Sequence, residues 1–121
     1  MKVADSTFIV EGLLKNKELL EEDLLITVDL ALYEAANSVW KHQYLLKDLD
    51  DGLPYLSILY GLVESGRIRI VNAGAELVEK AYSLSAKHRL SLYDTVFVAL
   101  AKELESPLAT LDERQARLMN Q

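Results

Sequence analysis

Short apolar runs alternate with longer amphipathic segments along this chain. The short runs are rich in Ile, Val, Leu and Ala, and such runs are typical of buried strands. The longer segments repeat their apolar residues at helical spacing, which indicates helices packed on one side. The pattern predicts strands at residues 2–5, 24–28, 67–71 and 108–111, and helices at residues 6–15, 29–44, 53–64, 76–88, 92–105 and 113–120. Residues 8–10 are apolar enough to fit a strand as well.

Strands that alternate with helices across short turns are typical of βα units. Such units form a mainly parallel sheet with helices on both faces, so we expect a three-layer α/β/α sandwich. The chain has 121 residues, half of them hydrophobic, and shows neither an internal repeat nor a low-complexity segment. This length predicts one domain spanning residues 1–121.

Composition and charge exclude several kinds of chemistry. The chain has no cysteine, which rules out a disulfide framework, a thiolate zinc site and a cysteine nucleophile. Its formal net charge of −6 repels nucleic acid unless cations or a local basic face intervene. No window approaches the roughly 20 apolar residues that cross a bilayer, and the first residues lack a signal-peptide pattern. We therefore expect a cytoplasmic protein with no membrane partner.

Four acidic residues interrupt or end apolar runs that would be more stable without a charge. Asp5 and Asp112 follow the first and last predicted strands, at the edge where open α/β sheets bind ligands. Asp94 lies in the first turn of an almost wholly apolar helix, and Glu34 lies about five residues inside another. If the sheet gathers these carboxylates, their repulsion raises pKa values and destabilises the fold. A hard cation such as Mg²⁺ or Mn²⁺ would relieve the repulsion and is the ion that phosphodiester chemistry uses.

A purely structural interpretation of the same acids stays open. Asp5, Asp29 and Asp112 occupy plausible N-cap positions, and the segment from Ser91 to Asp94 has the spacing of a capping box. A cap stabilises a helix start by about 1 kcal/mol, which would be reason enough for an acid there. Glu34 has no such explanation because it lies inside its helix.

Four segments of the chain form an ordered set of motifs: residues 3–7, 29–37 with 40–41, 90–101 and 108–112. Through these segments the chain resembles PIN-domain ribonucleases, and in particular the VapC toxins of VapBC toxin–antitoxin pairs. Each motif is degenerate, but their order and spacing are fairly specific and cover nearly the whole chain. One departure is Val28, where many relatives have proline before the acid that opens the helix.

The resemblance implies a Mg²⁺- or Mn²⁺-dependent endoribonuclease whose catalytic metal ligands correspond to Asp5, Glu34, Asp94 and Asp112. It also implies an RNA substrate, a homodimer and a VapB-type antitoxin whose basic tail enters the acidic groove. Three polar residues are candidates for supporting the acids, although each could equally bond only the backbone. They are Ser6, Asn37 and Thr110.

Two other functions remain as alternatives at this point. The first is a catalytically silent PIN-type binding module, which the presence of all four acids disfavours. The second is a receiver-type, phosphoryl-accepting signalling domain. That class needs paired acids after the first strand and a lysine after the last, whereas Asp5 is followed by Ser6 and Asp112 by Glu113.

Some surface features could be either structural or functional. Apolar residues that include Trp40, Tyr44, Tyr55 and Leu59 could form core or a partner surface, since exposed aromatic clusters mark interfaces. Four cations near the acidic motifs could hold RNA phosphates or be simply solvated. They are Lys41, Arg89, Arg114 and Arg117.

Overall fold

The computed structural model describes residues 1–121 and contains a four-stranded sheet in which every neighbouring pair is parallel. The strand order is β3-β2-β1-β4, so that β1 lies between the second strand and the last. Because all strands run the same way, their carboxyl ends meet at one edge of the sheet. The strands are β1 (Lys2–Ala4), β2 (Leu25–Val28), β3 (Ile68–Val71) and β4 (Leu108–Ala109).

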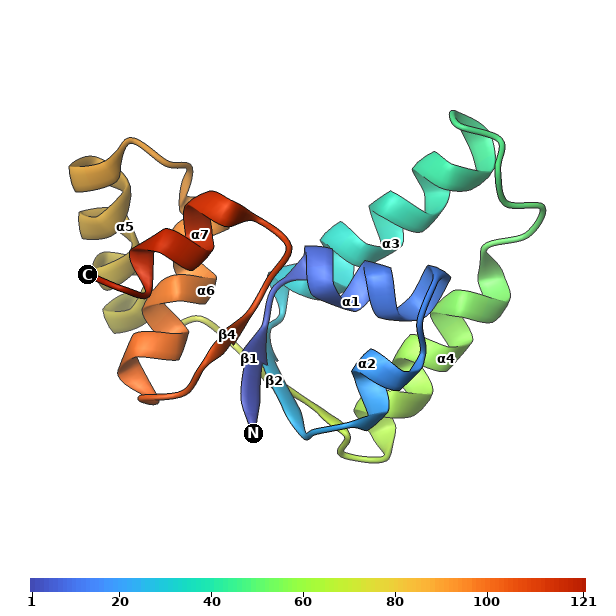
Figure 1. The fold of residues 1–121 in the computed structure, drawn as a ribbon, viewed down its shortest axis with the longest axis horizontal. Helices are drawn as coiled ribbons and strands as arrows, with labels where there is room; N and C mark the ends of the chain where they lie inside the picture. The colour runs from blue at the N-terminus through green and yellow to red at the C-terminus, as the bar shows by residue number, and fades with distance from the viewer.

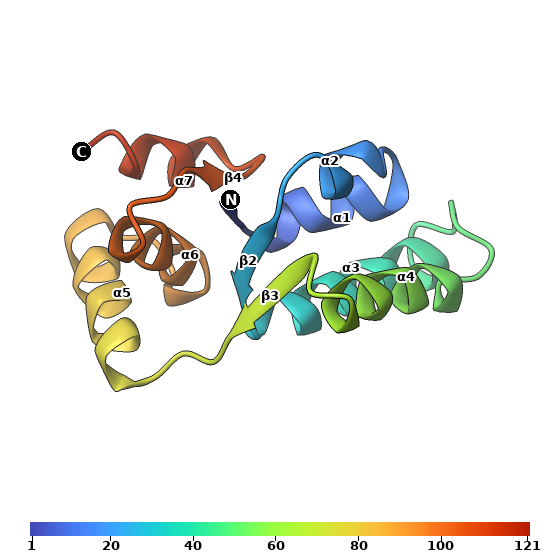
Figure 2. The ribbon, with the colours of Figure 1, turned by 90° about the horizontal axis from the view of Figure 1, so that it is seen from below.

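Helices cover both faces of the sheet, which confirms the predicted α/β/α sandwich (Figure 1). One layer, called here the N-terminal layer, contains α1 (Ser6–Leu14), α2 (Glu18–Glu21), α3 (Leu30–Tyr44) and α4 (Leu53–Glu64). The other, the C-terminal layer, contains α5 (Ala75–His88), α6 (Leu92–Glu103) and α7 (Glu113–Leu118). Figure 2 shows the two layers on opposite sides of β2 and β3. None of the helices has the length and apolar character needed to span a membrane.

The sheet is the centre of the hydrophobic core. All four residues of β2 are buried, as expected for a strand with helices on both sides. The buried hydroxyl of Thr27 donates a hydrogen bond of 2.6 Å to the carbonyl oxygen of Ala4, which satisfies a polar group inside the core. Helix α6 buries seven consecutive residues beginning at Thr95. The apolar run that follows Asp94 in the sequence is therefore core.

The structure differs from the sequence-based expectation in several local elements. Residues 8–10 are helix, not strand, and α6 ends at Glu103 because Glu105 adopts a left-handed backbone with φ of 52°. The last strand contains two residues where four were expected, and beyond it the Thr110 side chain bonds Asp5 and the amide of Asp112. A single apolar turn is too short to show helical periodicity, so α2 was not predicted.

The short helix α2 is held against α1 by one close contact. Leu20 is buried and packs over Gly12, where a Cβ atom would lie 2.4 Å from Leu20 Cγ. Such a distance is far inside van der Waals contact, so only glycine allows this approach.

The apolar residues of α3 and α4 separate into core and surface. Leu59 is fully buried, so the expectation that it contributes to a partner surface is wrong. Trp40 is 48% exposed and Tyr44 is 57% exposed, and their ring centroids lie 6.3 Å apart. The exposed aromatic pair is therefore on the outer side of α3.

Candidate active site

The four acids come to the carboxyl edge of the sheet from four different segments. Asp5 follows β1 and Glu34 is the fifth residue of α3, so both belong to the N-terminal layer. Asp94 is the third residue of α6 and Asp112 directly precedes α7, so both belong to the C-terminal layer. The site therefore lies where the two layers meet, near the labels of α1 and β4 in Figure 1.

Asp5 is almost completely buried, with 1% of its surface exposed, and its carboxylate accepts three hydrogen bonds. Oδ1 accepts from Thr7 Oγ1 at 2.7 Å and from the backbone amide of Phe8 at 3.0 Å. Oδ2 accepts from Thr110 Oγ1 at 2.5 Å. The bond from Phe8 confirms that Asp5 caps α1, yet the bond from Thr110 also ties it to the end of the last strand. Asp5 is thus both a helix cap and part of the acidic edge.

Two threonines connect the first acid to the last. The backbone amide of Asp112 donates to Thr110 Oγ1 at 2.9 Å, and the amide of Leu111 donates to Thr7 Oγ1 at 3.0 Å. These bonds fix the loop that carries Asp112 against the start of α1. Thr110 was selected from the sequence, whereas Thr7 was missed because a threonine in a first helical turn is common.

Asp112 caps α7 and is paired with an arginine. Its Oδ1 accepts from the backbone amides of Arg114 at 2.8 Å and Gln115 at 3.3 Å, which confirms the predicted cap. The Arg114 guanidinium lies 3.1 Å from Asp112 Oδ2 and 3.6 Å from Asp94 Oδ2. Its hydrogen bond lowers the pKa of Asp112 below the usual range, although burial opposes this. Arg114 therefore places one positive charge between these two acids.

Asp94 has two further polar neighbours. Gln115 Nε2 donates to Asp94 Oδ1 at 3.3 Å, and Ser91 Oγ donates to Asp94 Oδ2 at 3.3 Å. Gln115 is 2% exposed, and its Oε1 atom is buried with no hydrogen-bond partner. No sequence motif points to Gln115. Its only signal is its position three residues after Asp112.

Two of the predicted helix caps are wrong. Ser91 donates its hydroxyl to the Asp94 carboxylate, and no side-chain bond caps the start of α6, so the capping box does not form. Asp29 makes no side-chain capping bond to α3 because it already has helical backbone angles. Asp94 therefore does not have the helix-capping role that the purely structural interpretation assigned to it.

Glu34 is the least satisfied of the acids. It is partly buried, and its Oε1 atom has no hydrogen-bond partner. Burial raises the pKa of Glu34, the charges of Asp94 and Asp5 raise it further, and the neighbouring Ser6 hydroxyl opposes the rise. A cleft of about 250 Å³ opens beside it and is also lined by Ser6, Thr7 and Ser38. The negative charges of Asp5 and Asp94 therefore repel the charged form of Glu34.

The supporting residues chosen from the sequence occupy different places. Thr110 bonds Asp5 directly, and Ser6 lines the cleft with Glu34. Asn37 is exposed, and no side-chain hydrogen bond links it to an acid. The structure therefore brings Ser6 and Thr110 to the acidic edge and leaves Asn37 outside its hydrogen-bond network.

The chemistry of this edge fits a hard divalent cation, although the side chains do not form a closed metal cage. No three acidic side chains come close enough together, as they are arranged, to hold one ion. The available donors are all oxygen atoms, which Mg²⁺ and Mn²⁺ prefer. The protein's two buried side-chain polar atoms without partners, Glu34 Oε1 and Gln115 Oε1, both belong to residues near these acids. Such atoms cost free energy unless a cation, proton or water satisfies them.

Comparisons with known proteins agree with the fold. Residues 3–120 match the family model of the PIN domain. The chain is 37% identical over 94 residues to Ribonuclease VapC3 of Pyrobaculum aerophilum, covering 76% of this chain and 69% of that protein. The chain therefore belongs to the PIN-domain family. Within that family it is a VapC-like protein, which confirms the resemblance found in the sequence.

Solved structures show the same fold at low sequence identity. The crystal structure of VapC20 of Mycobacterium tuberculosis, described as a toxin that cleaves the sarcin–ricin loop, matches with a TM-score of 0.74 and 14% identity, over 97% of this chain and 94% of that chain. A toxin–antitoxin complex from Klebsiella pneumoniae matches with a TM-score of 0.70 and 12% identity, over 95% and 89% of the two chains.

Proposed function

We propose that this protein is a divalent-metal-dependent endoribonuclease, the toxin of a toxin–antitoxin pair, and that residues 1–121 form its single catalytic domain. The observation that carries the proposal is the partnerless Oε1 atom of Glu34, which shares its space with the charges of Asp5 and Asp94. The similar proteins include a ribonuclease and a toxin that cleaves the sarcin–ricin loop, which supports RNA as the substrate. Membership of the PIN family removes the receiver-type alternative.

In this proposal Asp5, Glu34, Asp94 and Asp112 hold Mg²⁺ or Mn²⁺ at the carboxyl edge of the sheet. When bound, the cation supplies Lewis-acid activation of the phosphodiester and of the attacking water. Thr110 orients the Asp5 carboxylate through its 2.5 Å hydrogen bond. Arg114 orients Asp112 through its ion pair, and with both carboxylates on a cation its guanidinium would be available to contact RNA phosphates.

An RNA cleavage assay with Mg²⁺, Mn²⁺ or EDTA tests this proposal. We expect cleavage with either metal, none with EDTA, and none from Asp94→Asn. Glu113→Gln is a matched control because Glu113 is an exposed acid next to Asp112 that makes no side-chain hydrogen bond. A folded wild-type protein that binds RNA but cleaves none under these conditions would instead favour the silent binding module.

The partner proposal is a homodimer and an antitoxin with a basic segment. The position of Arg114 between Asp94 and Asp112 supports the second part, because it shows that a guanidinium is accommodated among these acids. An arginine of the antitoxin would compete with the metal in the same way. Its binding is therefore expected to weaken as salt concentration rises.

The exposed aromatic pair Trp40 and Tyr44 supports a partner surface on α3. These side chains and the exposed Leu53 line a groove of about 240 Å³ between α3 and α4. Burying such residues supplies most of the binding energy in many interfaces. Sedimentation of wild type and Trp40→Ala tests the dimer. A monomeric wild type with unchanged antitoxin affinity in Trp40→Ala would refute this surface and leave the nuclease proposal intact.

A further inference from the structure

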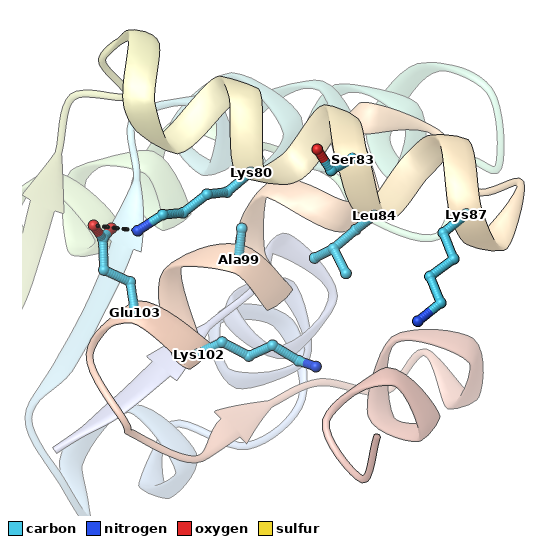
Figure 3. Close-up of a pocket in the computed structure, with 7 residues that line it drawn as sticks. All are labelled: Lys80, Ser83, Leu84, Lys87, Ala99, Lys102 and Glu103. Atoms are coloured by element: carbon cyan, nitrogen blue, oxygen red, sulfur yellow. Dashed lines mark hydrogen bonds and ion pairs between the residues drawn. The ribbon is translucent and has the colours of Figure 1, made fainter.

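A separate groove lies in the C-terminal layer, between α5 and α6, and none of the four acids lines it. It has a volume of about 450 Å³. Figure 3 shows three lysines around it, Lys80 and Lys87 from α5 and Lys102 from α6. Leu84 and Ala99 are its hydrophobic residues. The groove therefore combines ammonium groups with a wall that is mostly apolar.

The three lysines differ in their pairing. Lys80 Nζ lies 3.2 Å from Glu103 Oε1 and 3.4 Å from Glu76 Oε1, so its charge is compensated. Lys87 and Lys102 form no ion pair with an acidic side chain. Lys102 donates to the main-chain oxygen of Gln121, at 3.2 Å. Two ammonium groups without an acidic side-chain partner in one concave groove attract an anion, because a cleft focuses their field.

The charge of the chain is divided unequally, which matters for a polyanion. Residues 1–74 contain seven Lys and Arg against twelve Asp and Glu, whereas residues 75–121 contain six against seven. Two of those seven acids are Asp94 and Asp112. If a metal neutralises them, the C-terminal layer becomes the part of the protein that RNA approaches with least repulsion.

Helix α6 connects the groove to the proposed cleavage site. Asp94 lies in its first turn, and Ala99 and Lys102 follow on the same helix. At the helical rise of 1.5 Å per residue, Lys102 is about 12 Å along the axis from Asp94. A strand that passes the acids can therefore reach the groove within a few nucleotides.

We propose that the groove between α5 and α6 holds the single-stranded RNA substrate outside the cleavage site, and this rests on the proposed nuclease function. Lys87 and Lys102 contact backbone phosphates, while a ribose or base packs on Leu84 and Ala99. The lysines give no sequence preference because phosphate contacts position a strand without reading its bases. The groove thus raises affinity for long substrates over short ones.

Binding of phosphorothioate-linked RNA, whose backbone resists hydrolysis by an activated water, is measured by fluorescence anisotropy in Mg²⁺ and tests the proposal. We expect Lys87→Ala/Lys102→Ala to weaken binding of a long oligonucleotide about tenfold. The slope of the logarithm of the binding constant against the logarithm of salt concentration should become shallower by about 1.4, because two phosphate contacts are lost. Binding of a tetranucleotide stays unchanged. The double variant Lys17→Ala/Lys47→Ala is the control, since it removes two exposed, unpaired lysines from the N-terminal half. Equal affinity of wild type and the groove variant for long RNA would overturn the proposal.

Other occupants give different results. Displacement of long RNA from the groove by equimolar mononucleotide would assign a small-molecule site and overturn the RNA assignment. A change in sedimentation without a change in RNA affinity would assign the groove to a second copy of this acidic chain. Cleavage separates the two proposals: groove-dependent RNA binding without cleavage refutes only the nuclease, whereas cleavage with groove-independent binding refutes only the groove. A wild type that binds no RNA overturns the groove proposal.

Discussion

The two helical layers hold their acids in different ways. Asp5 and Glu34, from the N-terminal layer, contact no cation: hydroxyl and amide groups satisfy Asp5, and one oxygen of Glu34 has no partner. Asp94 and Asp112, from the C-terminal layer, share the guanidinium of Arg114. Buried negative charge without a counter-charge destabilises a fold whose total stability is only about 5–15 kcal/mol. Asp5 and Glu34, which contact no positive charge, are therefore the acids that a bound cation would stabilise most.

The largest effect is expected on cleavage, and it should be the same for an acid of either layer. Asp5→Asn and Asp94→Asn should each lower the rate by at least about 100-fold, the size of effect seen when one electrostatic group of an active site is lost. The amide keeps the shape of the side chain but removes the charge that holds the metal. Cleavage rates, measured with thermal unfolding as the control for folding, test this. Wild-type activity in either variant would remove that residue from the site.

Stability should distinguish the two caps. Asp5→Ala should lower the free energy of unfolding by about 2–3 kcal/mol, because it removes a cap and leaves buried donors without an acceptor. Asp112→Ala should cost about 1 kcal/mol, because its side chain is more exposed and α7 is short. Urea unfolding of both variants measures the difference. If both variants lost the same free energy of unfolding, the hydrogen bonds from Thr7 and Thr110 to Asp5 would add no stability beyond that of the helix cap.

Removing the charge of Glu34 should stabilise the metal-free protein. A carboxyl group whose pKa is raised by folding binds more protons in the folded state, so stability falls as pH rises from the ordinary Glu value through the raised one. Glu34→Gln removes that loss. We expect a higher melting temperature than wild type at neutral pH and no difference in acid. Melting curves across this pH range, with Glu113→Gln as the exposed control, test the sign.

The smallest effect is expected from Arg114→Ala. Arg114 is 60% exposed, so losing its ion pairs should cost at most about 1 kcal/mol. The same change should strengthen Mn²⁺ binding, because the metal no longer competes with a guanidinium beside Asp94 and Asp112. Titration of the variant with Mn²⁺, followed by paramagnetic relaxation, measures this. Weaker binding would show that Arg114 supports the metal site instead of competing with it.

The parts of the fold that could be predicted are those whose pattern is repeated over many residues. Strand β2 is buried on both faces, so its apolar run is visible directly in the sequence. Helix α2 has only four residues and depends on the fit of Leu20 over Gly12, which no periodicity reveals. The bond from Thr110, just beyond β4, goes to Asp5, a residue more than a hundred positions away. A one-dimensional pattern carries no information about that contact.

In the candidate site, too, residues placed by the topology could be predicted, whereas residues that matter through individual contacts could not. Asp5 and Asp112 were identified because strand ends of a parallel sheet meet at one edge, which follows from topology alone. Gln115 and Thr7 could not be identified, because their importance comes from which atoms they contact and not from their residue type. The pairing of Arg114 with two acids was missed for that reason as well.

The central position of β1 has a consequence for synthesis of the protein. Val3 pairs with Ile26 on one side and with Leu108 on the other, so one edge of β1 stays bare until residues near position 108 have left the ribosome. Until then Thr110 cannot orient Asp5, and Asp94 and Asp112 cannot join the edge. A nascent chain is therefore expected to hold Asp5 and Glu34 without the rest of the site, so the proposed metal site is assembled only after the last strand has paired with β1.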